Sequence, residues 1–595
     1  MKPPGESIPS PSVFQRLKER KLVQWAFAYL AGAFVVFQLL DALDVPLGLT
    51  PTLQRGILVM VGIGFPITLV LAWYHGEKGR QRVSGPELLM VAALLVVAGV
   101  ALALLPGVEL RRSVPSAPSD GDQLSIAVLP LDNFSPDPAD AYFADGMQEQ
   151  LVAMLARIKR LSVRGRTSAM RYRDDRKSLP EIAGELGVKF VIEGSVRIAG
   201  SHVSVTAQLM DAVRDEHLWV GEFDREFSVD DIVSIHREIA RQVVAEIRAV
   251  LTPEDEARLA AEPTANTEAY EEYLKGRFHW STRSAQGLET AIGHFQRAIG
   301  LDSTFALAYS GLADCYIALS YYSADVSPNE MFRRGEEAAQ ESIRLAPESA
   351  AAHASLGFLR LLGRRDWTGA EESLRHAISL DPTYPFAHHW LADLLAYSGR
   401  FEEAYGEGER AIELDPLSFS LNHSQAARLN LSRDFEAAIT QYERTIDLYP
   451  QYFLGWAGLA NALLAMGDIE GAVRNMARSD ELFGIDPVLS ETHLRMAADF
   501  HRTGTPGHLA PAFDTVSGFL PDWRASSAMW VGDTAKALDW LELAAAENWP
   551  DLLGLRSYFL WDPLRDHPRF QALMEEYFGN REPALSREPY PSPEP

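Results

Sequence analysis

Five short tripeptides recur at nearly constant intervals in the second half of the chain, and they restrict the possible folds more than any other feature. They read LDS at 301–303, LAP at 345–347, LDP at 380–382, LDP at 414–416 and LYP at 448–450. Successive tripeptides are separated by 44, 35, 34 and 34 residues. A fixed period of this length predicts stacked helical hairpins that share one continuous core.

Small residues recur with the same period. Ten residues beyond the third position of each tripeptide are Ala313, Gly357, Ala392, Ala426 and Ala460, and a second series is Ala370, Ala404, Ala438 and Ala472. Such positions allow neighbouring helices to approach closely. A 34-residue period ending in proline is the signature of the tetratricopeptide repeat. We therefore expect an all-α tetratricopeptide solenoid over residues 267–483.

The first interval is ten residues longer than the others. The excess falls around residues 320–331, between the two helices of one repeat. Insertions of this kind usually form exposed loops. We expect an exposed loop here, with Tyr321 and Tyr322 either solvated or in contact with a partner.

The first helix of each repeat is expected to line a concave groove. Counting from the tripeptides, the inward positions include Leu307 and Asp314 and the candidate partner-binding residues Phe358, Phe386, His389, Asp393, Tyr397, His423, Asn430 and Asn461. Aromatic, His and Asp side chains suit a peptide bound by stacking and hydrogen bonds.

Two more specific groove functions are weakly supported. Some tetratricopeptide proteins hold a peptide carboxylate with lysine and asparagine, but the corresponding sites are Ser310, Ala354, His389, His423 and Ala457. His389 and His423 occupy equivalent places in adjacent repeats, yet two histidines without a third ligand make a weak zinc site. We predict no metal site and no cofactor.

An α/β domain is predicted before the repeats. Residues 124–131 read as a strand, and residues 142–158 carry a helical stripe that includes Met147, Leu151 and Leu155. Two alternating runs meet at Ala199-Gly200-Ser201, which is a hairpin signal. The order β-α-β-α-β-β-α predicts a mixed sheet covered by helices. The acids of the first loop, Asp132, Asp137, Asp140 and Asp145, lack the spacing of a calcium loop and indicate turn and helix-start chemistry.

The long segments 126–151, 187–197 and 203–219 resemble the TolB amino-terminal-like domain, which is related to the FlgO-like domain. The resemblance covers about residues 123–252. It implies a non-catalytic periplasmic module, often placed between a membrane segment and tetratricopeptide repeats and sometimes behind a winged-helix or adenylate cyclase domain. It identifies the chain as similar to membrane-anchored tetratricopeptide proteins, although neither of those cytoplasmic domains fits its short cytoplasmic part.

Three uncharged segments in the first 106 residues, Leu22–Leu40, Gly56–Tyr74 and Leu88–Leu105, predict membrane-spanning helices. The alternative is a buried helical hairpin. Basic residues at 16–21 and 78–82 place the amino terminus in the cytoplasm by the positive-inside rule. We therefore expect a multi-pass bacterial inner-membrane protein whose large carboxy-terminal region is periplasmic and which contacts the lipid bilayer through three helices.

Charge and cysteine content exclude other classes. The formal net charge is −26. Because an acidic protein repels the phosphate backbone of nucleic acids, no nucleic-acid partner is expected. The one cysteine, Cys315, cannot form an intrachain disulfide, and we expect it to be buried.

The remaining boundaries follow from composition. We expect a cytoplasmic tail at 1–21, linkers at 107–122 and 253–266, an irregular helical connection at 484–525, a capping repeat at 526–579 and a disordered Pro-rich tail at 580–595.

The predicted function is a non-enzymatic scaffold or sensor that binds protein or peptide partners through the groove and the TolB-like domain. No catalytic motif is evident. The alternatives are a static envelope assembly factor and an enzyme whose site includes Asp132, Arg164, Arg166 and Glu193. Self-association is left open.

Overall fold

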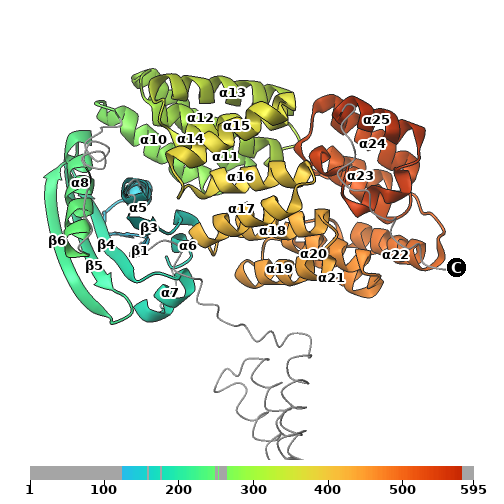
Figure 1. Ribbon diagram of the computed structural model, residues 1–595, viewed down its shortest axis with the longest axis horizontal. Coiled ribbons are helices and arrows are strands. Elements are labelled where there is room, and N and C mark those ends of the chain that lie inside the picture. The colour runs from blue at the N-terminus through green and yellow to red at the C-terminus, as the bar shows by residue number, and fades with distance from the viewer. Residues whose placement is uncertain are drawn as a thin grey trace, which may run out of the picture. The chain divides into compact units, whose positions relative to one another are not determined.

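The computed structural model describes residues 124–156, 158, 160–173, 177–247, 252 and 264–578, which form a small sheet domain followed by a body of helical hairpins (Figure 1). These residues all belong to the compact unit Asp122–Pro595. The predicted membrane-spanning segments 22–40, 56–74 and 88–105 lie outside the described residues, as do the tails 1–21 and 580–595 and the linker 107–122.

Among the described residues, no helix is both long enough and apolar enough to cross a membrane. Helices of 18 residues, such as α13 (Pro328–Leu345), bury one face against other helices and carry charged side chains such as Arg333 on the other. The predicted fold class with three transmembrane helices, and the predicted multi-pass inner-membrane localisation, are wrong on this finding. The corrected class is a mostly helical tetratricopeptide body with a small sheet region.

The sheet is mixed, as predicted. Its strands are β1 (Leu124–Val128), β2 (Asp132–Asn133), β3 (Leu161–Val163), β4 (Phe190–Ala199), β5 (His202–Asp211) and β6 (Glu216–Glu226). The order is β3-β1-β4-β5-β6, with β2 paired to β4. β1 is parallel to β3 and β4, whereas β4, β5 and β6 are antiparallel. The predicted hairpin at Gly200, which has a φ of 63°, joins β4 to β5.

Alternate residues of the central strands face two different cores. Ile126 and Ile192 pack with α5 (Ala141–Ala156) and α8 (Val229–Glu246). Ala127 and Val191 pack with α7 (Leu179–Leu186) on the opposite face. Helices therefore cover both faces of the sheet, which explains why β1 and β4 read as continuous apolar runs.

The acids of the first loop take structural positions. The Asp137 carboxylate accepts a 2.8 Å hydrogen bond from the Ala139 amide and caps the short helix η1 (Pro138–Asp140). Asp145 is buried inside α5 and forms ion pairs with Arg166 and Arg173. Arg166 belongs to α6 (Arg166–Met170), so Asp145 joins α5 to α6.

The repeats form six helical hairpins. Their helices are α10 (Thr267–Trp280), α11 (Ala285–Leu301), α12 (Ala306–Tyr322), α13, α14 (Ala350–Leu359) with its π-helical end η2 (Arg360–Arg364), α15 (Trp367–Leu380), α16 (Pro385–Tyr397), α17 (Phe401–Leu414), α18 (Phe419–Leu431), α19 (Phe435–Leu448), α20 (Phe453–Ala465) and α21 (Ile469–Phe483). The predicted small residues Ala313, Ala392 and Ala460 are fully buried, which fits the tetratricopeptide repeat.

The excess length of the second hairpin corrects one prediction. α12 and α13 have 17 and 18 residues, whereas α16 and α17 have 13 and 14, so each helix gains about one turn. Tyr321 and Tyr322 are therefore helical and half-buried, not part of an exposed loop. The next hairpin, one residue longer than the 34-residue period, accommodates its extra residue in the π-helical turn η2.

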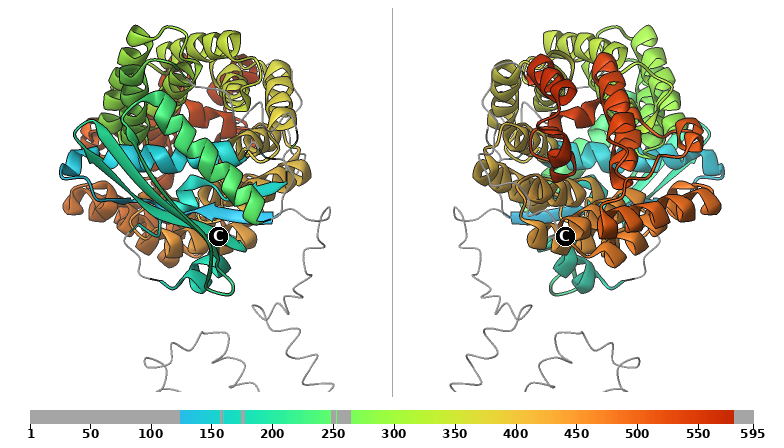
Figure 2. Two further views of the ribbon diagram at one scale, coloured as in Figure 1. Left: turned by 90° about the vertical axis from the view of Figure 1, so that its left-hand side faces the viewer. Right: turned by 90° about the vertical axis from the view of Figure 1, so that its right-hand side faces the viewer.

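The chain then folds back onto the repeats. α22 (Pro487–Thr503) and η3 (Pro511–Thr515) lead to the hairpin α23 (Pro521–Trp530) and α24 (Thr534–Glu547), and η4 (Pro550–Gly554), η5 (Phe559–Leu564) and α25 (Pro568–Phe578) follow. The Asn548 side chain donates to the Leu362 carbonyl at 2.9 Å, and Arg433 lies 2.6 Å from Asp562. The carboxy-terminal helices are thus attached to η2 and to the α18–α19 turn. Figure 2 (right) shows these helices nearest the viewer.

The sheet domain, which faces the viewer in Figure 2 (left), is attached to the repeats at two separate places. At the first, α5 packs on α10. The Tyr142 hydroxyl donates to Glu271 at 3.0 Å, and a Cβ at Gly146 would come within 2.6 Å of Leu274.

The second attachment, which we name the Asp415 latch, joins α6 to the α17–α18 turn. The Gly165 amide donates to the Leu414 carbonyl at 2.8 Å, and the Ser168 amide donates to Asp415 Oδ1 at 2.8 Å. The Ser168 hydroxyl donates to the same oxygen and accepts from the Leu417 amide at 2.7 Å. The sheet domain therefore bridges the first hairpin and the fourth and fifth.

Candidate functional site

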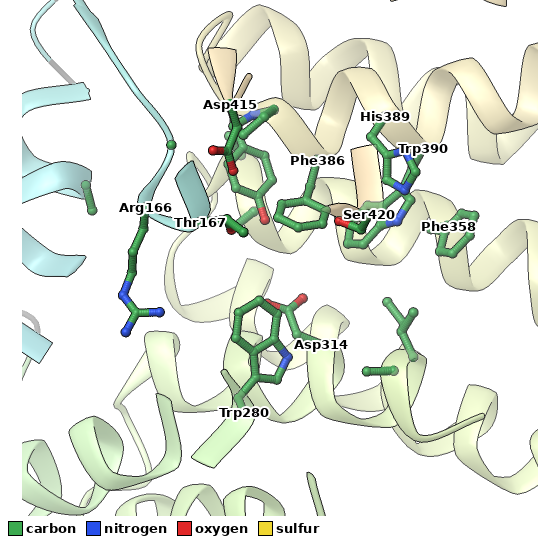
Figure 3. A pocket seen from close by; sticks show the side chains of 18 of the residues that line it. Arg166, Thr167, Trp280, Asp314, Phe358, Phe386, His389, Trp390, Asp415 and Ser420 are labelled. Atoms are coloured by element: carbon green, nitrogen blue, oxygen red, sulfur yellow. The ribbon is translucent and has the colours of Figure 1, made fainter. Parts of the chain in front are cut away.

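A cavity of about 1430 Å³ lies where the inner helices of the repeats, the sheet domain and the carboxy-terminal helices meet. Arg166 points into this space from α6, Trp280 and Asp314 from α10 and α12, and Phe386 and His389 from α16 (Figure 3). The groove expected from the repeats is thus lined by three parts of the chain.

Six of the eight predicted groove residues line the cavity: Phe358, Phe386, His389, Asp393, Tyr397 and His423. The other two, Asn430 and Asn461, are not among its lining residues. Asn461 accepts a 2.9 Å hydrogen bond from the Trp530 indole and so helps to hold the carboxy-terminal helices. Asn430 is buried.

Aromatic rings form one wall. The rings of Phe358 and Trp390 are stacked, with 5.1 Å between their centroids and an interplanar angle of 4°. The centroid of the Phe386 ring lies 5.6 Å from that of Trp390 and 6.0 Å from that of His389. Because the first helices of successive hairpins stand side by side, residues one repeat apart present a continuous apolar surface to a ligand.

The buried Arg428 side chain lines the same cavity. Arg428, whose side chain is 2% exposed, donates to Asp393 Oδ1 at 2.9 Å and to His389 Nδ1 at 2.7 Å. An arginine only donates, so His389 carries its hydrogen on Nε2, which lies 3.6 Å from Asp393 Oδ2. Burial lowers the pKa of His389 to about 4, so the ring is neutral at pH 7.

His423 is half-buried, and burial lowers its pKa to about 4. Its ring lies 5.7 Å from Tyr442 and 5.3 Å from Tyr452. The described residues contain no group of three His, Cys, Asp or Glu side chains placed to hold a metal ion. His389 is in any case engaged by Arg428 at its Nδ1.

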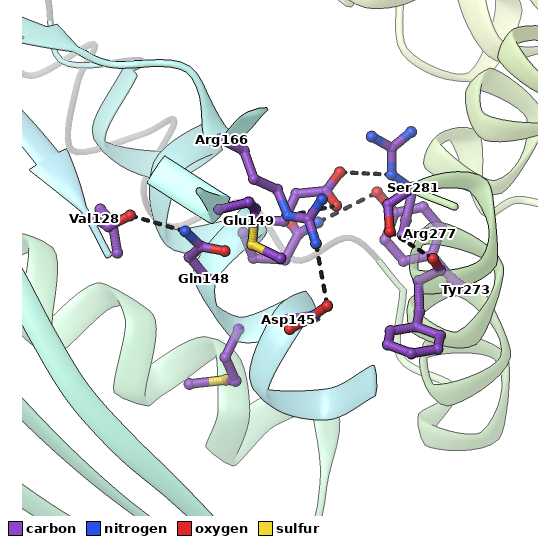
Figure 4. Close-up of polar contacts among 12 residues, drawn as sticks. Val128, Asp145, Gln148, Glu149, Arg166, Tyr273, Arg277 and Ser281 are labelled. Carbon is purple, nitrogen blue, oxygen red and sulfur yellow. Dashed lines mark hydrogen bonds and ion pairs between the residues drawn. The ribbon is translucent and has the colours of Figure 1, made fainter. Parts of the chain in front are cut away.

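The sheet-domain side of the cavity carries a network of alternating charges (Figure 4). Arg277 lies 2.5 Å from Glu149 and 3.6 Å from Asp314, and Arg166 lies 3.9 Å from Glu149. Burial raises the pKa of Asp314. Ser355 donates to the other Asp314 oxygen at 2.7 Å, so this carboxylate is held from two hairpins.

Sequence reasoning missed several lining residues. Arg428 follows Asp393 by one repeat plus one residue, a spacing that would have suggested their pairing. Tyr321 was assigned to a loop, and Trp523 and Asp551 lie in the part where the repeat period fades. The enzyme alternative expected four polar residues to share one site. Arg164 and Arg166 line the cavity, whereas Asp132 and Glu193 do not.

No family model matches the chain. A curated relative, putative adenylate cyclase 3 of Rhizobium meliloti (strain 1021), is 32% identical over 289 residues, which are 47% of this chain and 41% of the relative. The chain thus spans about two fifths of the length of that relative.

Solved structures similar to the chain include MamA, YrrB, described as a TPR protein with an unusual peptide-binding site, and PilF of Pseudomonas aeruginosa. MamA is 20% identical and covers 27% of this chain and 94% of its own, with a TM-score of 0.23. YrrB is 23% identical and covers 32% and 96%, with a TM-score of 0.21. PilF is 14% identical and covers 46% and 98%, with a TM-score of 0.28. We assign the tetratricopeptide fold from the six helical hairpins of the described residues and from the 34-residue period of the sequence.

Proposed function

We propose that this protein is a non-enzymatic scaffold that binds an extended peptide segment of a protein partner in the central cavity. The observation that supports this most directly is the composition of the wall, where Phe358, Phe386 and Trp390 offer stacking surfaces beside the buried Arg428–Asp393 pair. Aromatic surface with a few fixed polar groups is what peptide recognition uses.

The sheet domain contributes to the same site. We propose that it is a TolB amino-terminal-like module, as its sequence motifs suggest, and that it supplies one side of the peptide site through Arg166 and Glu149. Its two attachments to the repeats fix that side relative to the groove.

The name of the curated relative suggests nucleotide cyclisation, a chemistry that uses carboxylates to bind metal ions. We do not propose it here, because the cavity acids Glu149, Asp314 and Asp393 are each ion-paired with arginine.

Site-specific photocrosslinking tests the proposal. The photoreactive residue benzoyl-phenylalanine replaces Phe386 in the full chain, expressed in the cells that naturally produce it. The matched control carries the same residue at Phe134, which is 64% exposed and is not among the residues that line the cavity.

We expect the variant at 386, but not the one at 134, to be crosslinked to one defined segment of one partner. Identical products at both positions, or no product at 386, would refute peptide binding in the cavity. A crosslink whose yield is constant under all growth conditions would favour a static assembly role over a sensor.

A further inference from the structure

One end of the cavity combines aromatic side chains with acidic ones. Tyr321 of α12, Tyr397 of α16, Tyr452 before α20, Trp523 of α23 and Asp551 of η4 all line it. We name these five residues the acidic end. They come from three hairpins and the carboxy-terminal helices, so this end exists only in the folded-back chain.

The carboxylates here differ from Glu149, Asp314 and Asp393, which have arginine partners. The groups that act on Asp551 are Asp522, Trp523 and Asp393, and none of them is a cation. The Trp523 indole donates to Asp551 Oδ2 at 3.3 Å. Among the described residues, neither Asp551 nor Asp522 forms an ion pair with a Lys, Arg or His side chain. Two neighbouring carboxyls are thus left without a counter-ion.

The two carboxyls differ in exposure. Asp522 is 4% exposed, and burial, and next the Asp551 carboxylate, raise its pKa well above its ordinary value. Burial also raises the pKa of Asp551, but its side chain is exposed where it lines the cavity. Because burial favours the neutral form of a carboxyl, we assign the negative charge of this end to the exposed Asp551.

Two arginines of this region have other partners. Arg428 is held by Asp393, and the Arg365 guanidinium lies 3.4 Å from the centre of the Tyr577 ring. The phenol groups of Tyr321 and Tyr397 stay neutral, because burial raises their pKa. A negative charge surrounded by neutral aromatic rings attracts an organic cation, through Coulomb attraction and through the ring faces.

We propose that the acidic end binds an aliphatic ammonium group, as carried by a lysine side chain of the bound peptide. This inference rests on the proposed peptide-binding function and names the side chain that the cavity selects. A free polyamine has the same ammonium chemistry, and the experiment separates the two sources.

The test measures binding to the full chain by calorimetry at pH 7.5 and constant ionic strength. The probes are acetyl-Phe-Lys-Phe-amide, its norleucine analogue, which keeps the chain length without the charge, and spermidine. The variant is Asp551→Asn, whose amide oxygen can still accept from Trp523. The control variant is Asp499→Asn, an exposed acid of α22 that does not line the cavity.

We expect the lysine peptide to bind at least tenfold more tightly than the norleucine peptide. Asp551→Asn should abolish that preference, whereas Asp499→Asn should keep it. The thermal midpoint of Asp551→Asn should equal or exceed that of the wild type, because the substitution removes a charge that has no partner. A lost preference would then not be due to unfolding.

Three other outcomes separate the ammonium site from peptide binding and from binding of a free polyamine. Equal binding of the two peptides to the wild type would overturn the ammonium site and leave peptide binding intact. Binding of spermidine alone, dependent on Asp551, would support the ammonium site and refute the peptide as its source. Failure of all three probes to bind would overturn the inference.

Discussion

The Asp415 latch makes a quantitative prediction about pH. Asp415 is 2% exposed, and burial raises its pKa from 3.8 to about 6, against the hydrogen bonds from Ser168, which lower it. Over pH 4–6 the folded protein therefore holds a proton that the unfolded chain has lost. The contribution of Asp415 to the free energy of unfolding falls as the pH rises through this window, by about 3 kcal/mol in total.

Buried histidines act in the opposite direction over the same range. Burial lowers the pKa values of His236, His389 and His423 to about 4 each. The unfolded chain then binds more protons below about pH 6.5, so these groups make the folded protein less stable as the pH falls. The effect of Asp415 must consequently be measured as a difference between two proteins, in which the histidine contributions cancel.

The perturbation is Asp415→Asn, which mimics the protonated carboxyl and keeps an oxygen that accepts from Ser168. Below pH 4 the two proteins should be equally stable. At pH 7.5 the variant should be more stable, by up to about 3 kcal/mol. Chemical unfolding at a series of pH values measures this difference, and hydrogen exchange of the Ser168 amide, which donates to Asp415 at 2.8 Å, reports the latch itself.

A variant that is less stable than the wild type at pH 7.5, with lower protection of the Ser168 amide, would refute the reasoning. It would show that the charged carboxylate is needed for the latch and that its hydrogen bonds outweigh its burial.

The period of the sequence predicted the positions at which helices of the repeats touch. Every repeat makes the same helix–helix contact, so small residues such as Ala392 and Ala426 recur at a fixed spacing. The same counting placed Phe358, Phe386 and His389 on the inner face, and all three line the cavity.

Contacts between distant segments left no such signal. Ser168 and Asp415 are 247 residues apart, and the sequence around either residue does not predict their contact. The return of the carboxy-terminal helices depends on Arg365 and Arg433, whose backbone φ angles are 53° and 66° and whose side chains reach Asn548 and Asp562. Asn461 was therefore assigned to an open groove, because its contact with Trp530 of α23 could not be foreseen.

Two further substitutions test the cavity wall and the latch. Arg428→Ala should destabilise the protein by about 3–5 kcal/mol, because it leaves the Asp393 carboxylate, which is only 14% exposed, without its partner. Arg478→Ala, at an exposed pair, should change the free energy of unfolding by less than about 1 kcal/mol. Equal effects of the two would contradict the burial argument. Gly165→Ala acts on the latch from the other side, since a Cβ there would lie 2.3 Å from the Asp415 Cγ and must displace it. Hydrogen exchange should then show lower protection of the Ser168 amide than in the wild type, with unchanged protection of α20 and α21, which lie far along the chain from the substitution. Unchanged protection at Ser168 would mean that the sheet domain does not depend on this contact to stay docked, and that α5 and α10 alone hold it against the repeats.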